Sequence, residues 1–376
     1  MRPVDVPPEE TLPEPDKLEA APHPRAATAL FGQGPAETAF LEAFQSGRLH
    51  HGWMLTGPKG IGKATLAWRI ARFLLATPPD GGGGLFGAPP PPETLDIDPE
   101  HPVARRMLAR AEPGLFSLTR SVVESTGRMS REIRIDDVRR LRGFFSMSAS
   151  DGGRRVVIVD AADEMNVSAA NALLKLLEEP PKNATLLLVT HQPTRLLPTI
   201  RSRCRILPCL PLSAEDLSAA LTQAGLAPAA PDALTALAGG SVGAAVRLET
   251  EGGPEIYAAL LGLLSTLPRL DRAALGKLSG ATAGTGGQDQ LALTLDLLDI
   301  LLGRLARTGL LGAPFPEAAP REAETLQALS PDATAARRWA ELAARLTTRA
   351  RQGAAVNLDP QSLIFDTMLK IETEAA

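Results

Sequence analysis

The sequence predicts an α/β fold with a parallel sheet and a phosphate-binding loop, followed by a mainly helical C-terminal part. The glycine-rich loop Gly57-Pro-Lys-Gly-Ile-Gly62-Lys63 follows the apolar run Trp53-Met54-Leu55 and precedes a helical pattern. Between residues 155 and 207, nearly continuous apolar strands alternate with helices, as expected of a parallel sheet that is buried on both faces. From Ser213 onward the strand pattern disappears and helical spacing takes over.

Composition and charge exclude several classes of protein. The chain has 376 residues, enough for two or three domains, and its formal net charge of -4 argues against coating nucleic acid through bulk positive charge. Its two cysteines, Cys204 and Cys209, provide no disulfide framework and no four-cysteine metal site. We find no signal-peptide pattern and no apolar run near the roughly 18–20 residues that span a bilayer. We therefore expect a cytoplasmic protein without a membrane partner.

The pattern along the chain predicts four segments. Residues 1–27 are acidic and rich in proline, which predicts a disordered tail. Residues 28–211 form the expected α/β domain, interrupted by an exposed Pro/Gly insertion at 78–102. Residues 212–278 predict a small helical domain, and residues 279–376 predict a larger helical domain.

Each element of the α/β domain has its own signal. After Lys63, apolar residues recur at helical spacing, so the loop opens a helix. A helix over 168–179 carries leucines on one face and is stopped by Pro180-Pro181. The other predicted elements are helices at 36–47 and 136–147, strands at 115–119, 155–160, 184–190 and 204–207, and one further strand that ends with residues 133–135. Beyond residue 212 the predicted helices are 215–224, 231–238, 242–248, 291–308, 335–351 and 359–371, with a loop at 279–288.

The phosphate loop is present in outline. Gly57, Gly60 and Gly62 allow backbone N–H groups to converge on phosphate at a helix N-terminus, and Lys63 is placed to reach the terminal phosphates. The next residue, which usually supplies a hydroxyl to Mg²⁺, is Ala64, which has no side-chain oxygen. Thr65 comes one residue late, and on a helix its hydroxyl is turned by roughly 100° from the required direction.

The strand 155–160, which ends in Asp160, also lacks one of the residues that hydrolysis needs. Asp160 ends the strand 155–160 and is the natural second contact for Mg²⁺, although an Asp in this place can also cap a turn. Ala161 follows, where a hydrolysing enzyme would carry a Glu to polarise water. Three outcomes stay open: a nucleotide that binds weakly or structurally, a site that turns over, and an empty loop. We expect ATP or ADP, with Mg²⁺ only if the nucleotide binds.

The tripeptide Ser202-Arg203-Cys204 follows a loop rich in Pro, Thr and Arg. An arginine fixed at the edge of an α/β domain can project into a neighbouring subunit's nucleotide site and neutralise charge in the transition state. We therefore treat Arg203 as a candidate arginine finger that acts in trans.

Two stretches carry specific motifs. One is Val156-Val-Ile-Val-Asp160-Ala-Ala-Asp163-Glu-Met-Asn166, which continues to Leu-Leu-Lys-Leu-Leu-Glu178-Glu-Pro-Pro181. The other is Leu196-Leu-Pro-Thr-Ile-Arg201-Ser-Arg203-Cys204. Both stretches resemble bacterial clamp-loader AAA+ subunits, and among these the delta-prime subunits of DNA polymerase III. The resemblance covers residues 30–211 and is thinner beyond them.

The resemblance implies a subunit of a five-membered ring that opens a sliding clamp and places it on primed DNA. It implies a rather rigid stator, with gamma/tau-like motor subunits and a delta-like subunit as partners and a C-terminal collar for oligomerisation. Arg203 inherits the finger role by its place in the motif, Thr190 matches a first sensor, and Arg247 a second. Members of this family often carry a four-cysteine zinc module, but residues 81–110 have no cysteine, so we expect no zinc.

Two other interpretations compete with the stator. The chain could be an active gamma/tau-like ATPase motor subunit or another AAA+ ATPase, against which Ala64 and Ala161 count. It could also be an AAA+-like adaptor outside replication, which the block Leu-Leu-Lys-Leu-Leu-Glu-Glu-Pro-Pro disfavours. We do not expect the chain by itself to be an active ATPase.

Overall fold

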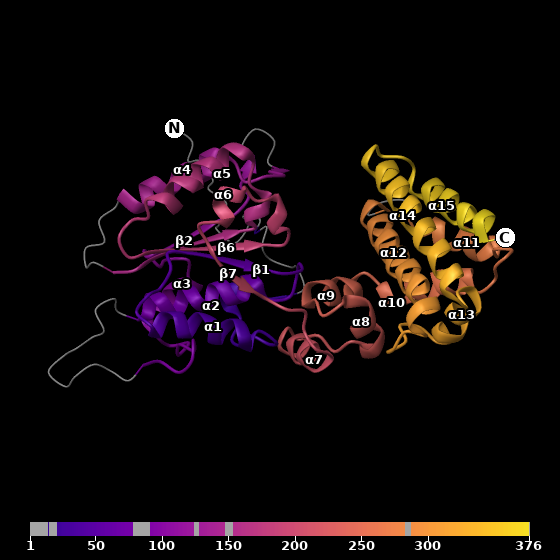
Figure 1. Cartoon of the computed structure of the whole chain (residues 1–376), viewed down its shortest axis with the longest axis horizontal. Helices are drawn as coiled ribbons and strands as arrows, with labels where there is room; N and C mark the ends of the chain where they lie inside the picture. The colour runs from indigo at the N-terminus through magenta and orange to yellow at the C-terminus, as the bar shows by residue number, and fades with distance from the viewer. Residues whose placement is uncertain are drawn as a thin grey trace, which may run out of the picture. The chain divides into compact units, whose positions relative to one another are not determined.

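The computed structural model describes residues 14, 21–77, 91–123, 128–146, 153–282 and 287–375. The chain divides into two compact units, Met1–Ala220 and Leu221–Ala376 (Figure 1). The three-domain division drawn from the sequence stays a prediction.

The first unit is built on a parallel sheet of five strands in the order β2-β5-β6-β1-β7. The central strand β6 is buried along its whole length, because both faces of the sheet are covered. This sheet, with the glycine-rich loop after β1, confirms the predicted α/β P-loop class. The strands are β1 (Gly52–Thr56), β2 (Leu115–Leu118), β5 (Arg155–Asp160), β6 (Ala184–Thr190) and β7 (Arg205–Pro208), and a short hairpin adds β3 (Val122–Val123) and β4 (Arg128–Met129).

Helices cover the two faces of this sheet (Figure 1). On one face lie α1 (Gly34–Gln45), α2 (Lys63–Ala76) and α3 (Pro102–Leu108). On the other lie α4 (Ile135–Ser146), α5 (Val167–Glu178) and the short α6 (Pro198–Arg201). Single 3₁₀ turns occur at Pro24–Ala26, Ala162–Glu164 and Pro193–Arg195.

Apolar spacing explains how the helices pack on the sheet. Leu66, Ile70 and Leu74 of α2 are fully buried, and the helix contacts β1, β5 and β6. On the other face, Leu173 and Leu177 of α5 join a core cluster with the side chains of β5 and β6. Asn166 caps α5 by accepting the Ala169 N–H at 2.9 Å, and the helix ends two residues before Pro180.

The last seven residues of the predicted disordered tail, 21–27, are ordered, contrary to the prediction. Residues 1–13 and 15–20 lie outside the described residues, but residues 21–27 are folded against α2. His23 is buried with its ring edge-on to Trp68, and the Arg72 guanidinium donates to the Arg25 carbonyl at 2.7 Å. These contacts supply the burial that the composition of the tail did not indicate.

The Pro/Gly insertion predicted at 78–102 lies partly outside the described residues, at 78–90. The described remainder is irregular up to His101, and Leu95 within it is buried. The helix α3 then begins at Pro102, a favourable residue for the first turn.

The second unit is helical. Here α12 packs along α14, while α15 contacts α11 and α14 (Figure 1). The helices α10, α11 and α13 were not predicted individually, and residues 283–286 of the predicted loop at 279–288 lie outside the description. The helices are α7 (Ala214–Gln223, across the boundary), α8 (Pro231–Ala238), α9 (Val242–Thr250), α10 (Gly253–Leu264), α11 (Arg272–Gly280), α12 (Gly287–Leu311), α13 (Glu322–Leu329), α14 (Ala333–Ala355) and α15 (Pro360–Ala375).

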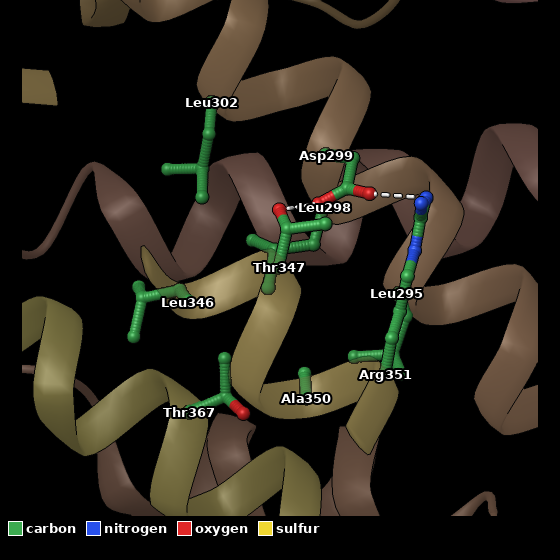
Figure 2. A pocket seen from close by; sticks show the side chains of 9 residues that line it. All are labelled: Leu295, Leu298, Asp299, Leu302, Leu346, Thr347, Ala350, Arg351 and Thr367. Carbon is green, nitrogen blue, oxygen red and sulfur yellow. Dashed lines mark hydrogen bonds and ion pairs between the residues drawn. The ribbon is translucent and has the colours of Figure 1, made fainter. Parts of the chain in front are cut away.

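Polar side chains join the helices of this unit at two places. Asp299 on α12 accepts hydrogen bonds from Thr347 and Arg351 on α14, beside a cavity of about 10 Å³ that has room for one water molecule (Figure 2). Deeper in the unit, the fully buried Glu322 binds Arg304 at 2.6 Å and accepts a hydrogen bond from the Tyr257 hydroxyl at 2.5 Å. Removing one partner of such a buried pair costs about 3–5 kcal/mol.

Within the described part of the chain, none of the helices is both long enough and apolar enough to cross a membrane.

Candidate functional site

The phosphate loop joins the end of β1 to the start of α2. Its glycines adopt backbone angles that other residues rarely reach, with φ of 145° at Gly57, 79° at Gly60 and 96° at Gly62. A Cβ atom on Gly57 would lie 2.4 Å from the carbonyl oxygen of Cys209. The loop is therefore shaped as a phosphate cradle and packed against the segment that leaves β7.

The ammonium group of Lys63 is folded back onto this loop. Its Nζ donates to the Gly57 carbonyl at 2.7 Å and also to the carbonyl of Pro58, and the side chain is almost completely buried. Burial lowers the pKa of Lys63 to about 8, against the opposing effects of Cys209 and the carboxylates of Asp160 and Asp163. The lysine is thus still mostly charged at neutral pH.

Asp163 is the carboxylate that organises the rim of the site. It accepts the backbone N–H groups of His191 at 3.0 Å and Gln192 at 3.2 Å, and so ties the turn after β5 to the end of β6. Burial would raise the pKa of Asp163, but hydrogen bonds, chiefly that from the backbone N–H of His191, together outweigh it and hold the pKa below its ordinary value. The sequence analysis did not include Asp163 in the site, although its place three residues after Asp160 was visible.

The structure brings Thr190 beside the loop and adds His191. Thr190 is fully buried and pairs with Thr56, the last residue before the loop. Burial and the charge of Lys63 lower the pKa of His191 to about 4, so its imidazole is neutral at neutral pH. No sequence motif pointed to His191; only its place directly after the candidate sensor could have done so.

Gln33 is a third residue that the sequence analysis missed. Its side-chain amide is buried and donates to the Ile61 carbonyl at 2.9 Å and to the Leu210 carbonyl at 2.8 Å. Its amide oxygen accepts the Leu210 N–H at 3.2 Å. One side chain therefore links the phosphate loop to the segment that follows β7.

These residues fit a phosphate group better than they fit a hydrated Mg²⁺ ion. The cradle of Gly57, Gly60 and Gly62 and the charged Lys63 supply the donors that phosphate requires. Asp160, at the end of β5, offers a carboxylate, whereas Ala64 and the buried Ala161 offer no side-chain oxygen. Thr65 lies in the first turn of α2, one residue beyond the usual position for a Mg²⁺ ligand.

Arg203 lies at the other end of the sheet. A Cβ atom built on Gly52, the first residue of β1, would lie 3.1 Å from the carbonyl oxygen of Arg203. The phosphate loop instead follows Thr56, the last residue of the same strand. Its guanidinium binds Glu178 at 3.0 Å and donates to the Thr199 carbonyl at 3.1 Å, and 37% of the side chain is exposed. The structure therefore separates Arg203 from Lys63, Asp160 and Thr190.

Arg247, the candidate second sensor, belongs to the second unit. On α9 it forms ion pairs with Glu251 at 3.1 Å and with Asp296 of α12 at 3.3 Å. These contacts join two helices of the unit, and its sensor role stays a prediction.

Comparisons with known proteins find a family model and several relatives that match part of this chain. The family model described as DNA polymerase III, delta subunit, matches residues 95–213. The DNA polymerase III subunit delta' of Pseudomonas aeruginosa is 41% identical over 210 residues, 54% of this chain and 56% of that protein. The subunit delta' of Escherichia coli is 32% identical over 166 residues, 44% of each chain.

The resemblance to delta-prime clamp-loader subunits is confirmed. The chain spans about half the length of these delta-prime relatives. The subunit gamma/tau of Mycobacterium tuberculosis is also similar, at 30% identity over 181 residues, 48% of this chain and 28% of that protein.

Two solved structures from Thermotoga maritima show weaker likeness. A protein related to the DNA polymerase III gamma subunit is 17% identical with a TM-score of 0.34, over 90% of this chain and all of that one. A RuvB variant is 16% identical with a TM-score of 0.38, over 76% of this chain and 79% of that one. The fold class rests on the strand order and the phosphate loop described above.

Proposed function

We propose that this chain is a delta-prime-like stator of a replicative clamp loader, which helps to load a sliding clamp onto primed DNA and supplies Arg203 to a neighbouring ATPase subunit. The observation that carries the proposal is the separation of Arg203 from Lys63. The strand β1 advances four residue steps of about 3.3 Å, roughly 13 Å, between Gly52 and Thr56, the last residue before the phosphate loop. The guanidinium binds Glu178 and Thr199, away from the phosphate loop of this chain, which supports a role at a nucleotide held by another subunit.

Loss of hydrolysis in the chain itself follows from its own site. Catalysis of phosphoryl transfer depends on a Mg²⁺ ion held by the loop hydroxyl and the strand aspartate, and on a residue that orients water. Ala64 and Ala161 stand where the hydroxyl and a water-polarising carboxylate would be. The phosphate cradle remains, so ATP or ADP binds there as a structural ligand, with Mg²⁺ only alongside the nucleotide.

The proposed partners follow from this role. They are gamma/tau-like motor subunits and a delta-like subunit, arranged with this chain in a hetero-pentamer in the cytoplasm. The helical second unit provides the collar through which the subunits assemble. The sliding clamp and primed DNA are reached through the complex.

One observation supports a second candidate, an active gamma/tau-like motor subunit. The similarity to a gamma/tau subunit covers 181 residues, and Lys63 and Asp160 are both in place. In that case another oxygen, such as that of Thr65, would have to replace the ligand missing at Ala64.

The variant Arg203→Ala tests the finger role in a clamp loader reconstituted with the motor subunits of the same organism. We expect assembly to be unchanged, because Arg203 is a partly exposed side chain at the surface of its own unit. We expect DNA-stimulated turnover at the one neighbouring site to fall by about 10³ or more. Arg195→Ala, which removes an exposed arginine from the preceding turn, is the matched control. An unchanged rate in Arg203→Ala would remove the finger role.

A further inference from the structure

The guanidinium of Arg203 is held by groups from two different elements. Glu178, the last residue of α5, places its Oε1 atom 3.0 Å from Nη2 of Arg203. The carbonyl of Thr199, in α6, accepts from Nη1 at 3.1 Å. Two anchors on different nitrogens fix both the position and the plane of the guanidinium, which a single contact would leave free to rotate.

Glu178 and Thr199 are exposed, but each is adjacent in sequence to a residue that is buried in the core. Leu177, next to Glu178, is buried, and its carbonyl lies 2.9 Å from Nε2 of His51, just before β1. Ile200, next to Thr199, is fully buried in the same core cluster as Leu177. The rigid core of the unit therefore determines where the two anchors lie.

The anchored guanidinium keeps donors for another molecule. A guanidinium has five N–H donors in a fixed planar fork, and the two anchors take one each. Because the side chain is 37% exposed, the remaining edge can be offered to an anion outside the unit. The pair thus orients the arginine without consuming its capacity to bind phosphate.

We propose that Glu178 is a positioning residue, which aims the Arg203 guanidinium at the nucleotide of the neighbouring subunit. This inference rests on the proposed finger role of Arg203. Transition-state stabilisation requires a charged group to be held within a fraction of an ångström of its place, so loss of the anchor lowers turnover more than nucleotide binding. Exposed ion pairs contribute little, which limits the effect to about two- to fivefold.

The test measures steady-state, DNA-stimulated ATP hydrolysis by the reconstituted loader containing Glu178→Gln, which keeps the shape of the side chain and removes its charge. We expect kcat at the one neighbouring site to fall about two- to fivefold, with KM for ATP changed by less than twofold. Glu179→Gln is the matched control, since Glu179 is the adjacent exposed carboxylate and forms no ion pair with any residue in the described ranges. We expect Glu179→Gln to keep the parent rate.

A double-mutant cycle separates positioning from a purely structural role. In the Arg203→Ala background, Glu178→Gln should have no further effect, because there is no guanidinium left to aim. An equal loss in both backgrounds, an unchanged rate, or a faster rate in Glu178→Gln would each overturn the inference. If Arg203→Ala itself leaves the rate unchanged, the proposed finger role fails; if only Glu178→Gln does, the finger role stands and this inference fails.

Discussion

Lys63 and Arg203 lie at opposite ends of β1. The Lys63 ammonium donates to Gly57, the residue directly after the strand, while the Arg203 backbone lies against Gly52, the residue at its start. One strand thus separates the glycine-rich loop of this chain from the partly exposed Arg203. This separation supports the proposal that the chain contributes to hydrolysis in a neighbouring subunit without hydrolysing a nucleotide of its own.

The first prediction concerns the packing of the phosphate loop. We expect Gly57→Ala to lower the free energy of unfolding of the first unit by about 1–3 kcal/mol, because the new Cβ would lie 2.4 Å from the Cys209 carbonyl oxygen and φ is 145°. Chemical denaturation measures the change.

The control for this substitution is Gly34→Ala at the start of α1, where a Cβ would meet nothing within 4 Å. We expect it to change the free energy of unfolding by less than about 0.5 kcal/mol. A Gly57→Ala protein as stable as Gly34→Ala would show that the contact between the loop and the segment after β7 is not tight.

The second prediction concerns pH. Burial lowers the pKa of Lys63 to about 8, so its positive charge is present at pH 7 and is lost as the pH rises towards 9. We therefore expect the affinity of the isolated chain for ADP, measured without Mg²⁺ by calorimetry, to fall about tenfold between pH 7 and pH 9.

The neighbouring groups do not titrate in this window. His191 has a pKa of about 4 and is already neutral, while burial raises the pKa of the Cys209 thiol to about 11. Lys63→Arg is the control, because a guanidinium stays charged throughout and should remove the pH dependence. Equal affinity at pH 7 and pH 9 in the parent chain would contradict a binding role for the Lys63 ammonium.

Much of the first unit could be predicted from the sequence because its signals are local. The glycines of the phosphate loop, the buried strand that ends at Asp160 and the stop at Pro180-Pro181 each depend on neighbouring residues only. The structure confirms the parallel sheet that these signals predict. The residues that were missed depend on contacts between distant segments: Gln33 meets Leu210, and Asp163 meets His191.

The helical second unit was harder to predict from the sequence, again because its features depend on contacts between distant segments. The helix α10 is apolar around most of its circumference, so helical spacing gave no clear face, and α11 and α13 are short. The buried Glu322 reads as a surface charge in the sequence, since its partners Tyr257 and Arg304 lie on other helices. These helices and the burial of Glu322 depend on tertiary packing, and the neighbouring residues in the sequence do not predict them.

The most direct test of the stator proposal is ATP hydrolysis by the purified chain alone, with and without primed DNA, beside Lys63→Ala. Because Ala64 supplies no Mg²⁺ ligand and Ala161 no water-polarising carboxylate, we expect no turnover by the parent chain above that of the variant. Turnover that depends on Lys63 would contradict the proposal and would make the chain a motor subunit.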